Sequence, residues 1–339
     1  MSALQQAIKK VVERQDLSVT EAKEAFLEIW NGQATDAQIA AFITALRMKG
    51  EVADEITAAA AVMRENAHHI VPATTQYLVD TCGTGGDGAD TFNISTAAAF
   101  VASGAGARVA KHGNRNVSSK CGSADVLEAL GITVTASPEI MKRCLDDAGI
   151  AFLFAPTLHK AMKYAIGPRR EIAIRTIFNM LGPLTNPAGA PSQVLGVYAA
   201  HLTETLATAL KNLGCTHAYV VHGLDGLDEL TLCGATKVSE VKNGAISTYA
   251  VQPEDFGLAR AKHSDLAGGL PAENSAIITA VLNGEKGPKR DIVVLNAAFA
   301  LAAAGIALSP EEGVTLAAHA IDTGAALDKL HRLVELTRE

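Results

Sequence analysis

Residues 82–96 read CGTGGDGADTFNIST, and this stretch decides the fold because it places a glycine-rich loop between a predicted strand and a predicted helix. Gly83, Gly85 and Gly88 match G-x-G-x-x-G, the pattern that holds the pyrophosphate of a dinucleotide. In a dinucleotide fold, a carboxylate at the end of the next strand binds the ribose hydroxyls. The next predicted strand, residues 107–110, leads instead into KHGNRNVSSKCGSAD, which is rich in cations and serines. The sequence therefore predicts a phosphate-binding loop for a ligand other than a dinucleotide.

Two predicted loops have the composition of an anion-binding cradle. In the first, Ser, Thr and Asn side chains accompany glycine amides, and a helix is predicted from about Ser95. Helix N-termini favour anions because they expose unpaired N–H groups and carry partial positive charge. Either loop alone is typical of an ordinary turn, but two of them after successive strands predict a ligand with several neighbouring phosphates, such as a phosphorylated sugar diphosphate. The second loop adds serines to the side chains of Lys111, His112, Asn114, Arg115, Asn116 and Lys120.

An acidic pair follows a third predicted strand. The strand at residues 217–221 leads into HGLDGLDEL, in which Asp228 and Glu229 are adjacent. Magnesium prefers carboxylates together with substrate phosphate oxygens, so an acidic pair facing the phosphate loops is a suitable arrangement for it. A solvated acidic loop is the alternative interpretation of these two residues alone.

Three arginines lie in the stretch GPRREIAIRT, at Arg169, Arg170 and Arg175. An arginine presents two parallel N–H groups that match a carboxylate, so these residues are suited to a carboxylate-bearing substrate. Surface helical arginines paired with Glu171 explain the same pattern equally well. No role is assigned to several histidines, because a lone histidine is more often structural than catalytic; these are His68, His69, His201, His263, His319 and His331. The sequence has no G-x-S-x-G, H-E-x-x-H or Walker A motif, so hydrolase, zinc-protease and P-loop functions have no support.

Composition limits the class of protein. A chain of 339 residues favours two domains, and 48% hydrophobic with 19% charged residues is typical of a globular protein. The net charge of -7 gives no general attraction to nucleic acid or to an anionic membrane. Five scattered cysteines without a C-x-x-C pair argue against a disulfide framework and against a zinc site, and they fit a reducing cytoplasm. The charged N-terminal stretch predicts no signal peptide, and the apolar run from Val293 is short enough to predict a buried helix.

The hydrophobic pattern divides the chain near residue 70. Before this point apolar residues follow helical spacing, and Ser18 with Glu21, like Thr35 with Gln38, has the spacing of a capping box. After Pro72, short β-branched runs alternate with alanine-rich stretches, which indicates a mostly parallel sheet covered by helices. The sequence therefore predicts an α/β protein with a small all-helical N-terminal domain. Strands are predicted at residues 77–80, 107–110, 150–154, 194–198, 217–221 and, nearer an edge, 245–251.

Read in order, four motifs make the chain resemble the anthranilate phosphoribosyltransferase family. They are DTCGTGGDGADTFNIST, VAKHGNRNVSSKCGSADVLEALG, RTIFNMLGPLTNP and HGLDGLDE. The resemblance implies that the phosphoribosyl group of phosphoribosyl pyrophosphate is transferred to the amine of anthranilate, with release of pyrophosphate, in tryptophan biosynthesis. It also implies a helical domain over residues 1–70, joined by part of residues 165–190, and an α/β domain over residues 71–339, in the fold shared with pyrimidine nucleoside phosphorylases. A homodimer formed through the helical domain is the implied assembly.

The resemblance further implies which residues bind the two substrates and Mg²⁺. Anthranilate is implied to lie near Gly83, Asn114 and Arg169, with the arginine as the partner of its carboxylate. Mg²⁺, with two ions expected per subunit, is implied to be held by Asp228, Glu229 and Ser95. No protein nucleophile is expected, because the amine of anthranilate is itself the nucleophile. The residues implied for phosphoribosyl pyrophosphate are Gly83, Gly86, Asp87, Thr91, Asn93, Ile94, Ser95, Thr96, Lys111, His112, Gly113, Asn114, Arg115, Asn116, Val117, Ser118, Ser119 and Ser123.

Two alternatives share the implied fold. A pyrimidine nucleoside phosphorylase would need only inorganic phosphate and a pyrimidine pocket, and a non-catalytic nucleic-acid-binding relative would show a broad basic face and degraded magnesium residues. The sequences of the two phosphate loops favour the anthranilate enzyme. So do the negative net charge of the chain and the presence of both Asp228 and Glu229. Two positions depart from the family pattern: Leu158 stands where many relatives have a further histidine, and Pro168 is displaced relative to their proline.

Overall fold

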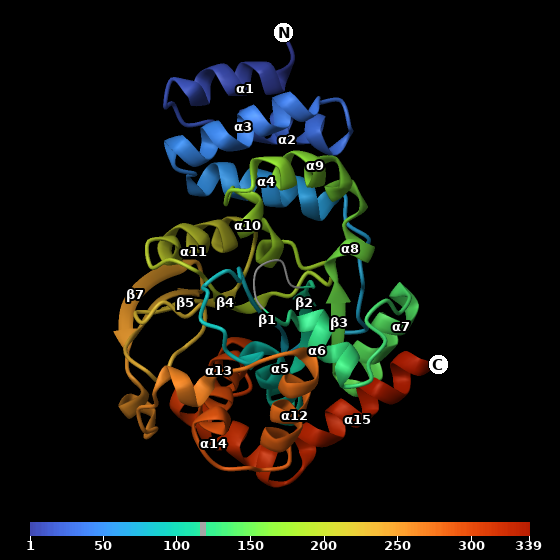
Figure 1. Ribbon diagram of the computed structural model, residues 1–339, viewed down its shortest axis with the longest axis vertical. Helices are drawn as coiled ribbons and strands as arrows, with labels where there is room; N and C mark the ends of the chain where they lie inside the picture. Colours follow the sequence, from blue (N-terminus) through green and yellow to red (C-terminus); the bar gives the residue numbers. More distant parts are fainter. Residues whose placement is uncertain (116–119) are drawn as a thin grey trace.

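The N-terminal part of the chain is a bundle of helices. The computed structural model describes residues 1–115 and 120–339 (Figure 1). In Figure 1 the blue helices α1–α4 lie together, and the green helix α9 packs against α2 and α3 although it comes from the middle of the chain. The capping boxes predicted at Ser18 and Thr35 are confirmed. The bundle contains α1 (Ala3–Val12), α2 (Val19–Trp30), α3 (Asp36–Lys49), α4 (Ala53–Glu65) and α9 (Lys163–Ile172).

Within the described residues, seven strands form one sheet in the order β3-β2-β1-β4-β5-β6-β7. Neighbours from β3 to β5 pair in parallel, while β6 and β7 add an antiparallel hairpin at one edge. The mostly parallel sheet and the edge position of β7 confirm the sequence prediction, whereas β6 was not predicted. The strands are β1 (Leu78–Gly83), β2 (Arg108–Gly113), β3 (Ile150–Phe154), β4 (Ser192–Gly196), β5 (His217–Gly223), β6 (Thr236–Lys242) and β7 (Ala245–Val251).

Helices cover both faces of the sheet. The helix α13 is almost wholly buried, as predicted for the apolar run from Val293. Among the described residues, no helix combines the length and the apolar character needed to cross a membrane. A π-helical turn spans Cys144–Ala148, and short 3₁₀ turns span Lys160–Met162, Gly182–Leu184, Pro253–Phe256 and His263–Leu266. The remaining helices are α5 (Ile94–Gly104), α6 (Ser123–Ala129), α7 (Pro138–Arg143), α8 (Ala155–Leu158), α10 (Phe178–Leu181), α11 (Leu202–Asn212), α12 (Pro271–Leu282), α13 (Pro288–Ala304), α14 (Pro310–Asp322) and α15 (Ala325–Arg338).

Alternate side chains of the strands enter two different apolar clusters. On β5, Tyr219 and Val221 belong to a cluster with α5 and α13, whereas Val220 belongs to a cluster with α11 and the helical bundle. Burial on both faces is what parallel strands require, because helices cover both sides. The bundle is joined to the second cluster through Trp30 of α2, which stacks on Phe178 of α10 with ring centroids 5.7 Å apart. The bundle and one face of the sheet therefore share a continuous core.

The strand order reverses between β1 and β4. The chain passes from β1 outward to β2 and β3, and then returns to place β4 on the other side of β1. In parallel α/β sheets, ligands bind beyond the carboxyl ends of the strands at such a switch point. Here the ends of the two strands are the paired residues Gly83 and Gly196. The glycine-rich loop begins directly after Gly83, so the fold places this loop at the switch point.

Candidate active site

Two glycines let the acidic loop cross the ends of β1 and β4. A Cβ atom at Gly196 would lie 1.6 Å from the carbonyl oxygen of Asp228, and one at Gly83 would lie 2.7 Å from Asp228 Oδ2. Such distances leave no room for a side chain. Asp228 Oδ2 also accepts a hydrogen bond from the Gly85 N–H at 2.7 Å. The acidic loop and the glycine-rich loop therefore meet over the switch point.

The glycine-rich loop is longer than the turn of a dinucleotide fold. Gly85, Gly86 and Gly88 have φ values of 66°, 79° and 73°, a region that other residues rarely adopt. The helix α5 begins only at Ile94, whereas in the dinucleotide pattern the helix opens within the glycine motif. The guanidinium of Arg175 donates a hydrogen bond to the Gly86 carbonyl. The loop is thus a separate cradle between β1 and α5.

Lys111 lies between β1, the start of α5 and the acidic loop. The sequence prediction ended the strand at Ala110, but β2 continues to Gly113 because Lys111 still pairs with Phe152 of β3. The side chain of this lysine is buried and donates to the Thr81 carbonyl, and its Nζ lies 3.3 Å from Ser95 Oγ. A buried ammonium group needs neighbouring acceptors or negative charge. The ammonium group of Lys111 therefore lies inside the site rather than on an exposed loop.

Three carboxylates surround the start of α5. Glu229 Oε1 accepts a hydrogen bond from the Ser95 N–H at 3.2 Å, and the Asp228 N–H lies 3.4 Å from Asp87 Oδ2. Burial raises the pKa of Asp228 well above its usual range, and the charges of Asp87 and Glu229 add to this effect. Burial likewise raises the pKa of Glu229 to about 7, although Lys111 opposes the shift. Crowded oxygen ligands whose negative charges repel one another fit a bound Mg²⁺.

A buried carboxylate supports the strand that carries Lys111. Asp80 is fully buried in β1 and accepts the His112 N–H at 3.0 Å through Oδ1. Burial raises the pKa of Asp80 to about 6, while a hydrogen bond with Asn186 and the charge of Lys111 oppose the shift. Asp80 is therefore part of the packing beneath the site and holds β2 against β1.

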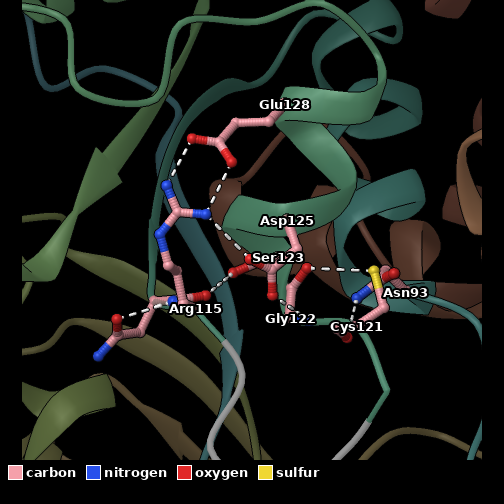
Figure 2. A network of polar contacts seen from close by, with 8 residues as sticks. Asn93, Arg115, Cys121, Gly122, Ser123, Asp125 and Glu128 are labelled. Carbon is pink, nitrogen blue, oxygen red and sulfur yellow. Dashed lines mark hydrogen bonds and ion pairs between the residues drawn. The ribbon is translucent and has the colours of Figure 1, made fainter. Parts of the chain in front are cut away.

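The basic loop after β2 is fastened to α6 by Arg115. Its guanidinium lies 3.0 Å from Asp125 Oδ1 and 2.5 Å from Glu128 Oε1, and Figure 2 shows these contacts converging from the loop onto the helix. The Ser123 hydroxyl donates to the Asn114 carbonyl at 3.1 Å. Asn93, at the start of α5, donates to the Cys121 carbonyl at 3.1 Å (Figure 2). The structure therefore joins the basic loop, α6 and the start of α5 in one network.

The other predicted phosphate-binding residues lie around the same loops. Thr91 forms an isolated β-bridge with Ala267. The hydroxyl of Thr96 is buried and has no hydrogen-bond partner within residues 1–115 and 120–339. Gly113 packs so closely that a Cβ atom there would lie 2.5 Å from Ser123 Oγ. The predicted residues Asn116, Val117, Ser118 and Ser119 lie outside the described residues.

His112, predicted to bind phosphoribosyl pyrophosphate, lies against His159, which received no role from the sequence. The rings of His112 and His159 make an edge contact with centroids 5.2 Å apart, and both Nε2 atoms are buried without a partner in the described part of the chain. His112 Nδ1 lies 3.0 Å from the Gly182 carbonyl, which requires the proton on Nδ1 and leaves a lone pair on Nε2. Burial lowers the pKa of His112 to about 3 and that of His159 to about 4. Both rings are therefore neutral at pH 7.

Arg169 lies in the last turn of α9, and its guanidinium is suited to bind a carboxylate. Its Cζ lies 5.2 Å from the centroid of the Phe178 ring, and burial lowers its pKa. Among the described residues, no carboxylate forms an ion pair with it, and the proposed pairing with Glu171 is not seen. Arg175 differs, because it stacks over the Tyr198 ring at 4.5 Å and contacts the glycine-rich loop.

Comparisons with known proteins agree with this architecture. The model of the glycosyl transferase family a/b domain matches residues 75–327, and that of its helical bundle domain matches residues 5–67. The chain is 60% identical to an anthranilate phosphoribosyltransferase of Moorella thermoacetica, over 98% of this chain and 97% of the relative.

Solved structures give the same result. The anthranilate phosphoribosyltransferase of Thermus thermophilus superposes with a TM-score of 0.93 at 43% identity, covering 98% of this chain and 99% of that one. The Saccharomyces cerevisiae enzyme in complex with PRPP and Mg superposes with a TM-score of 0.89 at 29% identity, covering 99% of this chain and 98% of that one. The helical bundle, the α/β sheet and the full-length similarity together show that the chain belongs to the anthranilate phosphoribosyltransferase family.

Proposed function

We propose that the site transfers the phosphoribosyl group of phosphoribosyl pyrophosphate to the amine of anthranilate, a step of tryptophan biosynthesis, and releases pyrophosphate. The observation that carries this proposal is the meeting of the glycine-rich loop, the start of α5, Lys111 and the acidic loop at one switch point. The phosphorylase alternative is not favoured, because full-length relatives at 52–60% identity are anthranilate phosphoribosyltransferases. The nucleic-acid alternative has no support from an acidic chain that retains Asp228 and Glu229.

Phosphoribosyl pyrophosphate is proposed to lie across the two loops. The Gly85 and Ser95 N–H groups donate to the carboxylates of Asp228 and Glu229, which supports an anion-binding role for the glycine-rich loop and the first turn of α5, and Lys111 adds a buried positive charge. The hydroxyl of Thr96, which has no partner among the residues that the structure describes, is a further donor near the start of this helix. The remaining residues implied by the family, from Gly83 to Ser123, complete the proposed binding surface.

Magnesium is proposed to be held by Asp228 and Glu229, with the hydroxyl of Ser95 as a further ligand and two ions per subunit. The three crowded carboxylates of the site, including Asp87, support this choice because oxygen ligands of this kind suit Mg²⁺. When bound, the cation offsets the negative charge that develops on the pyrophosphate leaving group.

The chain's own residues orient the two substrates and stabilise charge. The bond from the ribosyl carbon to pyrophosphate breaks with its electron pair going to pyrophosphate, the nitrogen lone pair of anthranilate forms the new bond, and the nitrogen then releases one proton to solvent. Lys111 and the loop amides stabilise the leaving group, and alignment of the two substrates provides much of the remaining acceleration. Anthranilate is proposed to lie near Gly83 and Asn114 with its carboxylate on Arg169, whose guanidinium lacks an acidic partner among the described residues.

The protein is proposed to act as a cytoplasmic homodimer that assembles through the helical bundle. Apolar side chains of the bundle are exposed, among them Val12, Met48 and Ile166. Exposed apolar groups of this kind are typical of a surface that is covered by a partner. The five free cysteines agree with a reducing compartment. Light scattering of the purified protein should give twice the mass of one chain.

Loss of anthranilate fluorescence tests the proposed reaction directly. Purified protein with phosphoribosyl pyrophosphate and Mg²⁺ should consume anthranilate, and the double variant Asp228→Asn/Glu229→Gln should lower turnover by about 100-fold or more, as expected when a metal site is removed. The double variant Glu254→Gln/Asp255→Asn changes an exposed adjacent acidic pair and serves as the matched control. Persistent fluorescence with the unmodified protein would refute the proposed reaction.

A further inference from the structure

Three side chains with metal-ligating atoms meet beside the loop that joins β5 to β6, two from this loop and one from the 3₁₀ turn His263–Leu266. The ligand atoms of Asp225, Cys233 and His263 all lie within 4.8 Å of one another. His263 Nε2 is 3.6 Å from Asp225 Oδ2. Of the five cysteines, Cys233 is the one that is not fully buried. A thiol, an imidazole and a carboxylate together form a donor set that is typical of zinc sites rather than of magnesium sites.

The backbone holds these three residues in place. The Leu224 N–H donates to the Ala235 carbonyl at 2.8 Å, which closes the loop between β5 and β6. The Ala261 N–H donates to the Leu232 carbonyl at 3.0 Å, which brings the segment before His263 alongside Cys233. The cluster is therefore formed by two segments whose relative position is fixed by hydrogen bonds.

Hydrogen bonds of Thr231 fix the two ligands on the loop. Its hydroxyl donates to Asp225 Oδ2 at 2.6 Å and accepts the Cys233 N–H at 2.9 Å. Supporting hydrogen bonds of this kind orient the ligands of metal sites. The Asp225 side chain is only 9% exposed, whereas that of His263 is 58% exposed, so the cluster is open to solvent on one side.

The spacing of the donor atoms suits a tetrahedral ion. Zinc bonds of about 2.0 to 2.3 Å place neighbouring ligand atoms roughly 3.5 Å apart. The 3.6 Å between His263 and Asp225 meets this value, and the thiol lies within 4.8 Å of both. Asp225 is the shared partner of the other two side chains, because the Cys233 thiol hydrogen-bonds to it and His263 lies within ion-pair distance of it. Three protein ligands leave the fourth position for water.

We propose that Asp225, Cys233 and His263 form a binding site for a thiophilic divalent cation such as Zn²⁺, separate from the magnesium site. The Cys233 sulfur binds as the thiolate, so its proton is released to solvent when the cation enters. The two sites lie on one loop but face different neighbours, because Asp225 contacts Thr231 while Asp228 contacts Gly85. A bound ion would join Asp225 to Cys233 and so brace the segment that carries Asp228 and Glu229.

Titration of the purified full-length protein with Co²⁺ tests the proposal. Excess Mg²⁺ is present throughout, so that the magnesium site is occupied. One equivalent of Co²⁺ should give the strong visible bands of tetrahedral coordination and a thiolate-to-cobalt charge-transfer band, and Zn²⁺ should abolish both. Cys233→Ser should remove the charge-transfer band, and His263→Gln should weaken Co²⁺ binding by at least about 10-fold, the lower end of the loss for an outer partner of a metal ligand.

Matched variants distinguish this site from others. Cys215→Ser and His331→Gln change a thiol and an exposed imidazole elsewhere, and Asp228→Asn changes the magnesium site; all three should retain both spectral features. Because His263 is exposed, His263→Gln remains informative even if Cys233→Ser does not fold. Three results would overturn the proposal. They are a spectrum with no bands beyond the weak ones of six-coordinate cobalt, a charge-transfer band that survives Cys233→Ser, and loss of Co²⁺ binding in Asp228→Asn.

Discussion

At the residue scale, the lack of a Cβ atom at two glycines allows the acidic loop to reach the phosphate loops. Gly196 and Gly83 are paired across β1 and β4, and the backbone and side chain of Asp228 occupy the space where their Cβ atoms would be. Lys111 and Glu229 then approach Ser95 from different elements. The glycines are thus needed for a close approach of backbone segments rather than for a turn.

Replacing Gly196 by alanine should displace the acidic loop. The added Cβ would lie 1.6 Å from the Asp228 carbonyl oxygen, so the loop must move. We expect a loss of at least about 2 kcal/mol in the free energy of unfolding, at the level of an overpacked site, together with weaker dependence of turnover on Mg²⁺. Gly234→Ala is the control, because nothing lies within 4 Å of its Cβ position. Equal stability and equal Mg²⁺ dependence of the two variants would contradict this account.

Arg169→Ala should raise the KM for anthranilate more than the KM for phosphoribosyl pyrophosphate. The reason is that a guanidinium without an acidic partner among the described residues is the proposed contact for the anthranilate carboxylate. Steady-state kinetics with each substrate varied in turn measures both constants. Arg170→Ala removes the adjacent arginine and should change neither KM. A proportionate rise of both constants in Arg169→Ala would argue against the assignment.

At the scale of elements, the sequence predicted strands best where they are continuously apolar. β1 to β5 are buried on both faces, so their β-branched runs stand out, whereas β6 mixes Val238 and Val241 with charged residues and was missed. The turn signal Asn243–Gly244 between β6 and β7 was available, since both residues have positive φ. Strand ends were less certain, because β2 continues through Lys111 by pairing with β3.

The same reasoning explains which site residues were predicted. The glycine-rich loop and the acidic pair are local patterns, so composition and position after a strand indicate them. The histidine pair His112–His159 and the cluster around Cys233 each combine residues that are distant in the sequence. Only the packing of the chain brings these residues together. The absence of a C-x-x-C pair argues only against a zinc site whose ligands are neighbours in the sequence. It does not bear on a site whose ligands come from separate segments.

The junction between α2, α9 and α10 gives a prediction at this scale. Phe178 of α10 stacks on Trp30 of α2 and lies under the guanidinium of Arg169 at the end of α9. Phe178→Leu should cost about 1 to 2 kcal/mol of stability, as for a core change that removes part of a buried side chain, and should also raise the KM for anthranilate because Arg169 loses its support. Phe299→Leu, in the other apolar cluster, should cost a similar amount and leave this KM unchanged. Urea unfolding and steady-state kinetics measure the two effects, and identical kinetics of both variants would contradict the expected support of Arg169.

At the scale of the whole molecule, the helical bundle and one face of the sheet share a core, and several ionisable groups are buried in the chain. His112 and His159 are buried as neutral rings, with pKa values lowered to about 3 and about 4. A lowered pKa in the folded state contributes stability that is present above the unfolded pKa and is lost as the pH falls toward the folded pKa. Asp80 acts in the opposite direction, because its pKa is raised to about 6 and its contribution is lost as the pH rises through that value.

The histidine contribution can be separated by comparing variants. We compare the free energy of unfolding of the unmodified protein with that of His159→Asn. Between pH 7.5 and pH 5 the difference between them should shrink by about 2 kcal/mol, because each pH unit below an unfolded pKa near 6.5 removes roughly 1.4 kcal/mol from the unmodified protein. Urea unfolding at a series of pH values measures this difference. His331→Gln, an exposed change, should show a constant difference over the same range. A pH-independent effect of His159→Asn would mean that His159 is not buried as a neutral ring.

The central claim is that the glycine-rich loop, the start of α5 and the acidic loop hold one phosphorylated sugar between them. The most direct measurement is a crystal structure of this protein soaked with phosphoribosyl pyrophosphate and Mg²⁺. The account predicts phosphate oxygens within hydrogen-bond distance of the glycine-rich loop and Lys111, with the cation between the pyrophosphate and the pair Asp228 and Glu229. Ligand density elsewhere, with these loops free of it, would contradict the account.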